Sequence, residues 1–190
     1  VGIVWECCET FASLPKDVKE LALQEIKSCL GLINDAITES EEYYNEWQEN
    51  LCGVAQNEKH DSLDELQEQH IIASIGLAKV VRSLLKKISK CISKNAQTND
   101  ASKVGQLDAA TQTIKRLSPS VDDLFCGIYS ESLTETLNEG SELAGLVEKL
   151  LLLCRSSHFC LDEDVSWMDF LSHAREHNLK KLITSSEPGP

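Results

Sequence analysis

The stretch "IIASIGLAKVVRSLLKKISKCI", residues 71–92, decides the fold class. Its apolar side chains return every third or fourth residue, a spacing that places them on one face of an α-helix. This face consists of Ile71, Ile75, Ala78, Val81, Leu85, Ile88 and Ile92. Three more apolar residues, Ile72, Leu77 and Leu84, widen it beyond the narrow seam of a two-stranded coiled coil. A face of this width is typical of a helix that is buried among several neighbours in a globular bundle.

The rest of the chain repeats this pattern. Residues 17–47 carry an apolar stripe at alternating steps of four and three, which is one helical face held for about seven turns. It consists of Ala22, Ile26, Cys29, Ile33, Ala36, Ser40, Tyr43 and Trp47. Shorter amphipathic stretches follow at residues 104–117, 118–129, 132–154 and 167–182. The last of these is predicted to turn inward Trp167, Phe170, Leu171, Ala174, Leu179 and Leu182.

Helices of this length joined by short polar loops form antiparallel bundles. Residues 1–12 add a short helical piece before the first long stretch, and no segment shows convincing strand alternation. We therefore predict an all-α, antiparallel up-and-down bundle of about five main helices plus a short N-terminal helix. The bundle is expected to be a single domain over residues 1–184, followed by a disordered tail at residues 185–190.

The charge balance narrows the class of partner. The chain has 31 acidic and 18 basic residues, a formal net charge of −13. Nucleic acids and anionic membranes attract basic proteins through their phosphates, so this balance disfavours both. The longest apolar run, residues 150–154, is also far too short to cross a membrane. We expect protein partners, no direct nucleic-acid binding and no membrane binding, while the oligomeric state stays open.

The beginning of the chain and its cysteines suggest a compartment. The chain starts Val-Gly-Ile-Val-Trp, with neither an initiator Met nor a secretory signal, so we expect it to be the C-terminal part of a longer chain. Its eight cysteines contain no C-x-x-C pair. Most fall where a helix places an apolar residue, as Cys29, Cys91 and Cys126 do. This pattern favours reduced thiols and a cytoplasmic and nuclear location.

The string "HAREH" contains the inverted zinc-protease motif H-x-x-E-H, formed by His173, Glu176 and His177. On a helix, both imidazoles would share one face and could hold zinc. Such enzymes need another acidic ligand well downstream, and only 13 residues follow His177, with Glu187 as their sole carboxylate. We therefore predict a solvated helix face at these residues.

A second group of possible metal ligands consists of Cys154, His158 and Cys160. Their spacing matches no common zinc module and no fourth ligand is evident, so a helix end with buried thiols is the favoured interpretation. The chain also lacks a Gly-x-Ser-x-Gly elbow and a Gly-rich phosphate loop. We predict a non-enzymatic protein without a cofactor or metal.

Two charge clusters bear on partner binding. Residues 39–68 hold ten acidic side chains and one Lys. One interpretation is a solvated helix-loop-helix tip, and the other is a docking surface for a basic partner segment. In the second case the predicted contact residues are Glu41, Glu42, Tyr43, Tyr44, Glu46 and Trp47. The basic stretch at residues 79–94 is expected to pair with acidic neighbours or with its helix dipole.

The string "LSPSVDDLFCGIY", residues 117–129, is first of all a helix start. Ser118 is predicted to cap the free backbone N–H groups, and Pro119 suits the first helical position. Asp122 and Asp123 place negative charge near the positive end of the helix dipole. A helix start is enough to explain this string, and no catalytic or binding role is needed.

The same string resembles a segment of the cyclin-D-interacting protein family, also called the maternal Id-like proteins. Three other stretches resemble the family in the same order. They are "VGIVWECCETFASLPKD" (1–17), "VGQLDAATQTIKRL" (104–117) and "EDVSWMDFLSHAREHNLKKL" (163–182). The resemblance covers nearly the whole chain in patches, with residues 48–70 the least similar.

This resemblance implies regulation by binding. Members of the family are described as partners of D-type cyclins and as Id-like antagonists of helix-loop-helix transcription factors that restrain cell-cycle progression. The apolar faces of the present chain are needed for the bundle, so such a factor would bind its surface or require a helix to open. The alternative is a structural adaptor bundle like the rods of talin and vinculin, which would not be expected to share residues 118–124.

Overall fold

The computed structural model describes residues 16–54 and 62–184, and within them all regular structure is helical. The elements are α2 (Val18–Val54), α3 (Ser62–Asn95), α4 (Ala101–Ile114), α5 (Leu117–Tyr129), α6 (Leu133–Arg155), the 3₁₀ turn η1 (Asp162–Asp164) and α7 (Val165–Thr184). The predicted N-terminal helix and C-terminal tail lie outside the described residues. In the described part of the chain, no helix combines the length and apolar character needed to span a bilayer.

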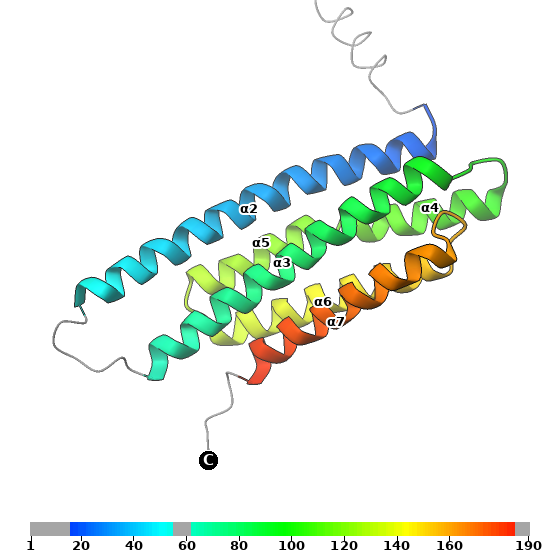
Figure 1. The fold of residues 1–190 in the computed structure, drawn as a ribbon. Helices are drawn as coiled ribbons and strands as arrows, with labels where there is room; N and C mark the ends of the chain where they lie inside the picture. The colour runs from blue at the N-terminus through cyan, green and yellow to red at the C-terminus, as the bar shows by residue number, and fades with distance from the viewer. Residues whose placement is uncertain (1–15, 55–61, 185–190) are drawn as a thin grey trace, which may run out of the picture.

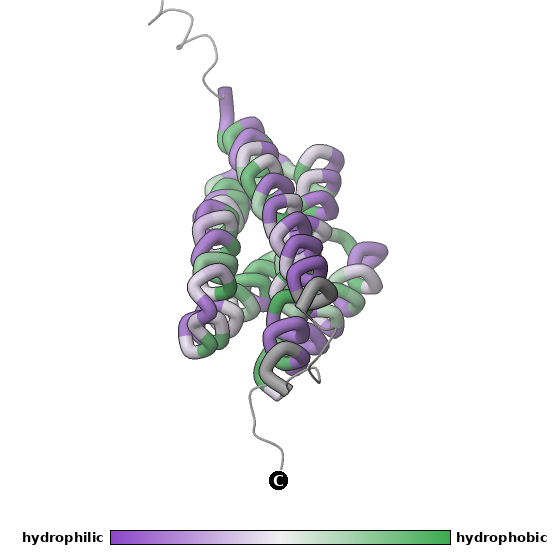
Figure 2. Tube along the Cα trace, turned by 90° about the vertical axis from the view of Figure 1, so that its left-hand side faces the viewer, coloured by the Kyte–Doolittle hydropathy of each residue, from purple (hydrophilic) through white to green (hydrophobic). Residues whose placement is uncertain are grey.

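The helices run alternately up and down along one common direction (Figure 1). α4 and α5 follow each other along α2, so the six described α-helices form five antiparallel rods. α3 lies centrally and contacts α2, α5, α6 and α7. Figure 2 shows hydrophobic residues turned toward the inside of the bundle and hydrophilic residues turned outward. The predicted all-α, up-and-down bundle is confirmed.

The predicted apolar face of α3 forms the centre of the core. Its members Ala78, Val81, Leu85, Ile88 and Ile92 are fully buried. Two of the widening residues, Leu77 and Leu84, are fully buried as well, because α3 has neighbours on several sides. The third, Ile72, is 44% exposed, so its assignment to the core was wrong. It lies on the strip of α3 that faces outward.

The stripe of α2 is also confirmed where it meets the core. Ala22, Ile26 and Ile33 are fully buried, and even the polar Ser40 is 1% exposed. The Ser40 hydroxyl satisfies its hydrogen bonding locally, because it lies 2.8 Å from the carbonyl oxygen of Ala36 and 2.8 Å from the hydroxyl of Tyr129. A polar residue therefore fits this stripe without an unpaired group.

The junction between α4 and α5 differs from the predicted helix start. Arg116 keeps a helical backbone conformation, and its carbonyl accepts the Ser120 N–H at 3.2 Å. α5 begins at Leu117, so Ser118 lies inside its first turn, where it is buried rather than capping. The predicted N-cap at Ser118 was wrong. Pro119 still lies in the first turn, where a missing N–H is tolerated.

Two other residues predicted on apolar faces are exposed. Phe170 is 70% exposed, because the inward face of α7 is formed by Met168, Leu171 and Leu182. Cys126 on α5 is exposed as well. Both assignments were wrong because a wide apolar pattern does not specify which edge of a helix meets its neighbours.

Two glycines allow close helix contacts. A Cβ atom on Gly127 of α5 would lie 2.9 Å from the backbone nitrogen of Thr136, at the start of α6. A Cβ atom on Gly140 of α6 would lie inside the Leu182 side chain of α7. The helices approach this closely because glycine has no side chain at either position.

We expect Gly127→Ala to destabilise the fold by about 1–3 kcal/mol, since backbone atoms cannot move aside as a side chain can. Gly145 on α6 is the matched control, because a Cβ atom there meets nothing within 4 Å. Gly145→Ala is expected to stabilise the helix by about 0.5–1 kcal/mol. Urea unfolding measures both free energies. Equal effects of the two substitutions would contradict the close α5–α6 contact.

His70 of α3 is buried, and burial lowers the pKa of its imidazole, opposed in part by a backbone hydrogen bond at Leu182. The unfolded chain therefore binds a proton more readily than the folded chain below about pH 6.5. Stability is expected to be fully present above that pH and to fall as the pH drops through the folded-state pKa. Unfolding at pH 8 and pH 5.5 measures this loss, and His70→Gln should reduce it. A His70 NMR titration at or above the ordinary value would contradict the prediction.

Candidate partner-binding surface

The outer side of α2 carries a row of carboxylates. Asp35, Glu39, Glu42 and Glu46 follow one another at steps of four, three and four, so one face of the helix presents them all. All four are exposed. The ion pairs of α2 to described residues use Glu25 and Glu41, not these four. The row is therefore a stripe of uncompensated negative charge.

The acidic stripe continues onto α5 and α6. Burial raises the pKa of Asp122, and the neighbouring charges of Asp123 and Glu39 raise it further. The pKa of Glu139 on α6 is raised by burial and then by Asp123 and other carboxylates. These shifts show that the groups lie close enough to repel one another. We call the combined surface the acidic face; it consists of Asp35, Glu39, Glu42, Glu46, Asp122, Asp123 and Glu139.

The six residues predicted as a docking surface do not lie on one side of α2. Glu42 and Glu46 belong to the acidic face. Glu41 turns toward α3 instead, where its carboxylate lies 2.7 Å from Lys79 Nζ. Residues 41–47 span almost two helical turns, so their side chains point all around the axis. Contact of these six residues with a partner stays a prediction.

The three predicted aromatic anchors are partly buried within the bundle. The ring of Tyr43 packs edge-on against Tyr129 of α5, with 4.9 Å between centroids. Tyr44 donates its hydroxyl hydrogen to Glu68 of α3 at 2.6 Å, and the ring of Trp47 stacks on Tyr44 at 6.3 Å. Burial, followed by the bond to Glu68, raises the pKa of Tyr44 to about 12. These rings hold α2 against α3 and α5.

A groove lies on the α3 side of these residues. Its volume is about 510 Å³, and it is lined by Glu41, Tyr44, Asn45, Ile72, Ile75, Gly76, Lys79 and Asn178. Three helices therefore contribute to it: α2, α3 and α7. The exposed Ile72 and the paired Glu41 and Lys79 give the groove both apolar and charged walls. Sequence reasoning missed it, because no pattern within one helix indicates which other helices lie beside it.

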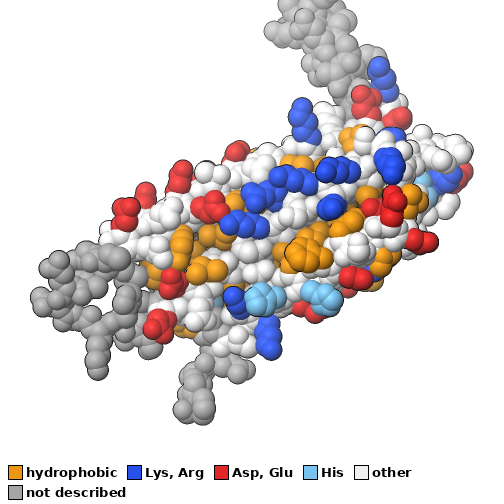
Figure 3. All heavy atoms as spheres, in the orientation of Figure 1, with side chains coloured by type: hydrophobic (Ala, Val, Ile, Leu, Met, Phe, Trp, Pro, Cys, Tyr) orange, Lys and Arg blue, Asp and Glu red, His pale blue; other side chains and the backbone are white. Residues whose placement is uncertain are grey.

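A basic ridge runs along the outward strip of α3 and crosses the middle of the face in Figure 3. It consists of Arg82, Lys86, Lys87 and Lys90, and none of them has an ion pair to a described residue. The expected pairing of this stretch with acidic neighbours is confirmed only for Lys79 with Glu41 and for Lys94 with Glu163, at 2.7 and 3.3 Å. The ridge and the acidic face lie on different sides of α2.

The H-x-x-E-H residues form a solvated helix face, as predicted. His173, Glu176 and His177 are all exposed on α7. The Glu176 carboxylate lies 3.2 Å from the guanidinium of its neighbour Arg175. The described residues bring no further acidic ligand to these histidines.

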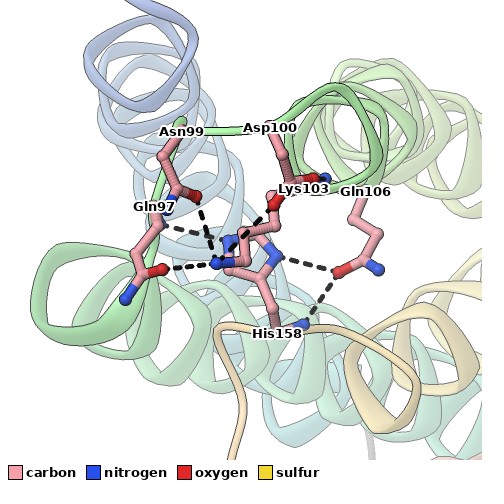
Figure 4. Close-up of polar contacts among 6 residues, drawn as sticks. All are labelled: Gln97, Asn99, Asp100, Lys103, Gln106 and His158. Carbon is pink, nitrogen blue, oxygen red and sulfur yellow. Dashed lines mark hydrogen bonds and ion pairs between the residues drawn. The ribbon is translucent and has the colours of Figure 1, made fainter.

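His158 holds two loops together instead of joining Cys154 and Cys160 (Figure 4). Its ring atom Nε2 accepts the backbone N–H of Gln97 at 3.1 Å, so Nδ1 is the protonated nitrogen and donates to Gln106 at 2.8 Å. The oxygen of Gln106 also accepts the His158 backbone N–H at 2.8 Å. Burial, followed by the charge of Lys103, lowers the pKa of the ring. Both ring nitrogens are in use, which excludes His158 as a partner of the two thiols in this arrangement.

Lys103 completes this polar cluster. Its ammonium group donates to Gln97 and Asn99 and lies 3.7 Å from the Asp100 carboxylate (Figure 4). Asp100 in turn accepts the Lys103 N–H at 2.9 Å as the N-cap of α4. The α3–α4 connection, the start of α4 and the α6–α7 connection are therefore joined at one end of the bundle.

Comparison with known proteins supports an assignment to a family. The family model "Grap2 and cyclin-D-interacting, C-terminal" matches residues 43–152, and the corresponding N-terminal model matches residues 1–46. The two matches meet within α2, where the helix is continuous.

Several relatives cover almost the whole chain. "Cyclin-D1-binding protein 1 homolog" of Danio rerio is 33% identical over 95% of this chain and 56% of its own length. The Xenopus laevis homolog is 28% identical over 95% of this chain and 57% of its own length. "Cyclin-D1-binding protein 1" of Homo sapiens is 27% identical over 97% of this chain and 56% of its own length. The chain thus spans about half the length of these curated relatives.

The resemblance drawn from four stretches of sequence is confirmed by these matches. The C-terminal family model alone covers more than half of the residues. The chain belongs to the Grap2 and cyclin-D-interacting family.

Proposed function

We propose that this chain is a protein-binding module that receives a basic segment of a D-type cyclin on its acidic face. The observation that carries this proposal is the set of seven neighbouring carboxylates on α2, α5 and α6, without ion pairs to described residues. The names of the relatives support cyclin D1 as the partner, since they are called cyclin-D1-binding proteins.

A basic partner segment would relieve the repulsion among the carboxylates of the acidic face. Neighbouring carboxylates destabilise one another, and this repulsion adds to the effect of burial in raising the pKa of Asp122 and of Glu139. A cationic partner segment removes this repulsion and gains attraction to several charges at once. Complementary charge of this kind mainly speeds encounter and selects the partner.

The same surface suits an Id-like action on helix-loop-helix transcription factors. The apolar faces of α2 and α3 are buried in the core, so exchange of a dimerisation helix would require the bundle to open. The acidic face needs no such opening. We propose that it binds the basic region of such a factor, which lies in the DNA major groove when the factor binds DNA.

We also propose that the chain acts by binding rather than by catalysis, in the cytoplasm and the nucleus. Five cysteines of the described residues are free thiols, the state typical of reducing compartments. The H-x-x-E-H residues lie open on α7 without a further acidic ligand from the described residues.

Charge reversal tests the proposed surface. We expect Glu42→Lys with Glu46→Lys to weaken binding to cyclin D1 by about 10-fold or more at low salt, mostly through a slower association rate. Glu41 stays unchanged, because its reversal would also break the pair with Lys79. Surface plasmon resonance at two salt concentrations measures the rates, and the difference between variants should shrink at high salt.

The matched control is Asp162→Lys with Glu176→Lys. Both residues are exposed and the change in net charge is the same, but they lie on η1 and α7. Glu176→Lys removes one contact of Arg175, which keeps its ion pair with Glu148 at 2.9 Å. This variant is expected to bind nearly as the parent chain does. Equal weakening by both double variants would show a net-charge effect and overturn the proposed surface. A folded chain that does not bind cyclin D1 would favour the structural adaptor function.

A further inference from the structure

Three thiols and one carboxylate meet where the α6–α7 connection covers the end of α3. Cys91 comes from α3, Cys154 from the end of α6, Cys160 from the connection and Asp164 from η1. The ligand atoms of Cys91, Cys160 and Asp164 all lie within 4.8 Å of one another. The thiol of Cys154 adjoins the group through a hydrogen bond to Cys160. We call these four residues the thiol cluster.

The backbone around the cluster is held firmly. Cys154 is fully buried and Cys91 is 6% exposed, so their helices fix two of the four groups. The connection is anchored by Phe159, whose side chain is fully buried and whose carbonyl accepts the Asn95 side-chain N–H at 3.0 Å. The next residue, Cys160, donates its backbone N–H to the Ser157 hydroxyl at 3.3 Å. The cluster is thus assembled by packing rather than by chance surface proximity.

Asp164 has the outer contacts that orient a metal-binding carboxylate. One oxygen accepts the Leu161 backbone N–H at 2.9 Å, and the other accepts the Trp167 indole N–H at 2.8 Å. The Cys91 thiol also hydrogen-bonds to this carboxylate, and a metal ion that displaces the thiol proton would take that position. Ligating carboxylates in proteins are characteristically held by hydrogen bonds of this kind.

We propose that the thiol cluster is a structural Zn²⁺ site with Cys91, Cys154, Cys160 and Asp164 as ligands. Thiolates select zinc over magnesium or calcium, and four protein ligands close the coordination sphere. A tetrahedral site with zinc–sulfur bonds of about 2.3 Å places its ligand atoms roughly 3.8 Å apart. The ligand atoms of Cys91, Cys160 and Asp164 already lie within 4.8 Å of one another, so small side-chain shifts bring these three to that separation. Binding releases the thiol protons and joins α3, α6 and η1.

Zinc binding is measured on the reduced, metal-free chain of 190 residues. Cys7, Cys8 and Cys52 are first replaced by Ser, because the structure does not describe their side chains. We expect one Zn²⁺ per chain by calorimetric titration and a higher melting temperature with zinc. Co²⁺ as a probe should give thiolate-to-cobalt charge-transfer absorption and the visible bands of a tetrahedral ion.

In this background, Cys160→Ser and Asp164→Asn are each expected to lower zinc affinity at least 10-fold. Cys126→Ser is the matched control, since Cys126 is an exposed thiol on α5. His158→Gln tests the alternative set read from sequence and should retain zinc. Circular dichroism confirms that each variant is folded. Absence of zinc binding in the folded background chain would overturn the proposal, as would binding that survives Cys160→Ser or is lost with His158→Gln.

Discussion

The burial of α3 on nearly all sides is the constraint on which the rest of the structure depends. Leu77, Leu84 and Ile88 are fully buried because α2, α5, α6 and α7 all contact this helix. Each large aliphatic side chain buried in this way contributes about 1.5–3 kcal/mol. Only one narrow strip of α3 remains outside, and it carries the exposed Ile72 and the basic ridge. The exposed residues of α3 are therefore those on the one strip of the helix that its neighbours leave uncovered.

α2 separates two surfaces of opposite charge. Its outer row of carboxylates continues onto α5 and α6, whereas Glu41 turns the other way and pairs with Lys79 beside the basic ridge. The aromatic rings of Tyr43 and Tyr44 lie inward of both surfaces, where they attach α2 to its neighbours. A partner that recognises the acidic face would thus meet charge rather than aromatic anchors, and the ridge would stay open to solvent.

One end of the bundle is organised by side chains rather than by helix packing alone. His158 and Lys103 join two connections through neutral and charged hydrogen bonds. The thiol cluster lies at the same α6–α7 connection, and Asn95 links that connection to the end of α3. The connection therefore has a defined conformation despite its short length and polar composition.

Apolar periodicity within the sequence determined the helices, their antiparallel order and most of the core, because spacing along one helix depends on that helix alone. The family, by contrast, was indicated by the resemblance of residues 117–129 and three other stretches to its members, not by their spacing. Other features follow only from the tertiary structure. Phe170 lies outside the core and Ser118 does not cap a helix. Cys91, rather than His158, lies beside Cys160. The carboxylates of α5 and α6 likewise join those of α2 only in the folded chain. Contacts between helices depend on their relative rotation and position, and no pattern within a single helix specifies either.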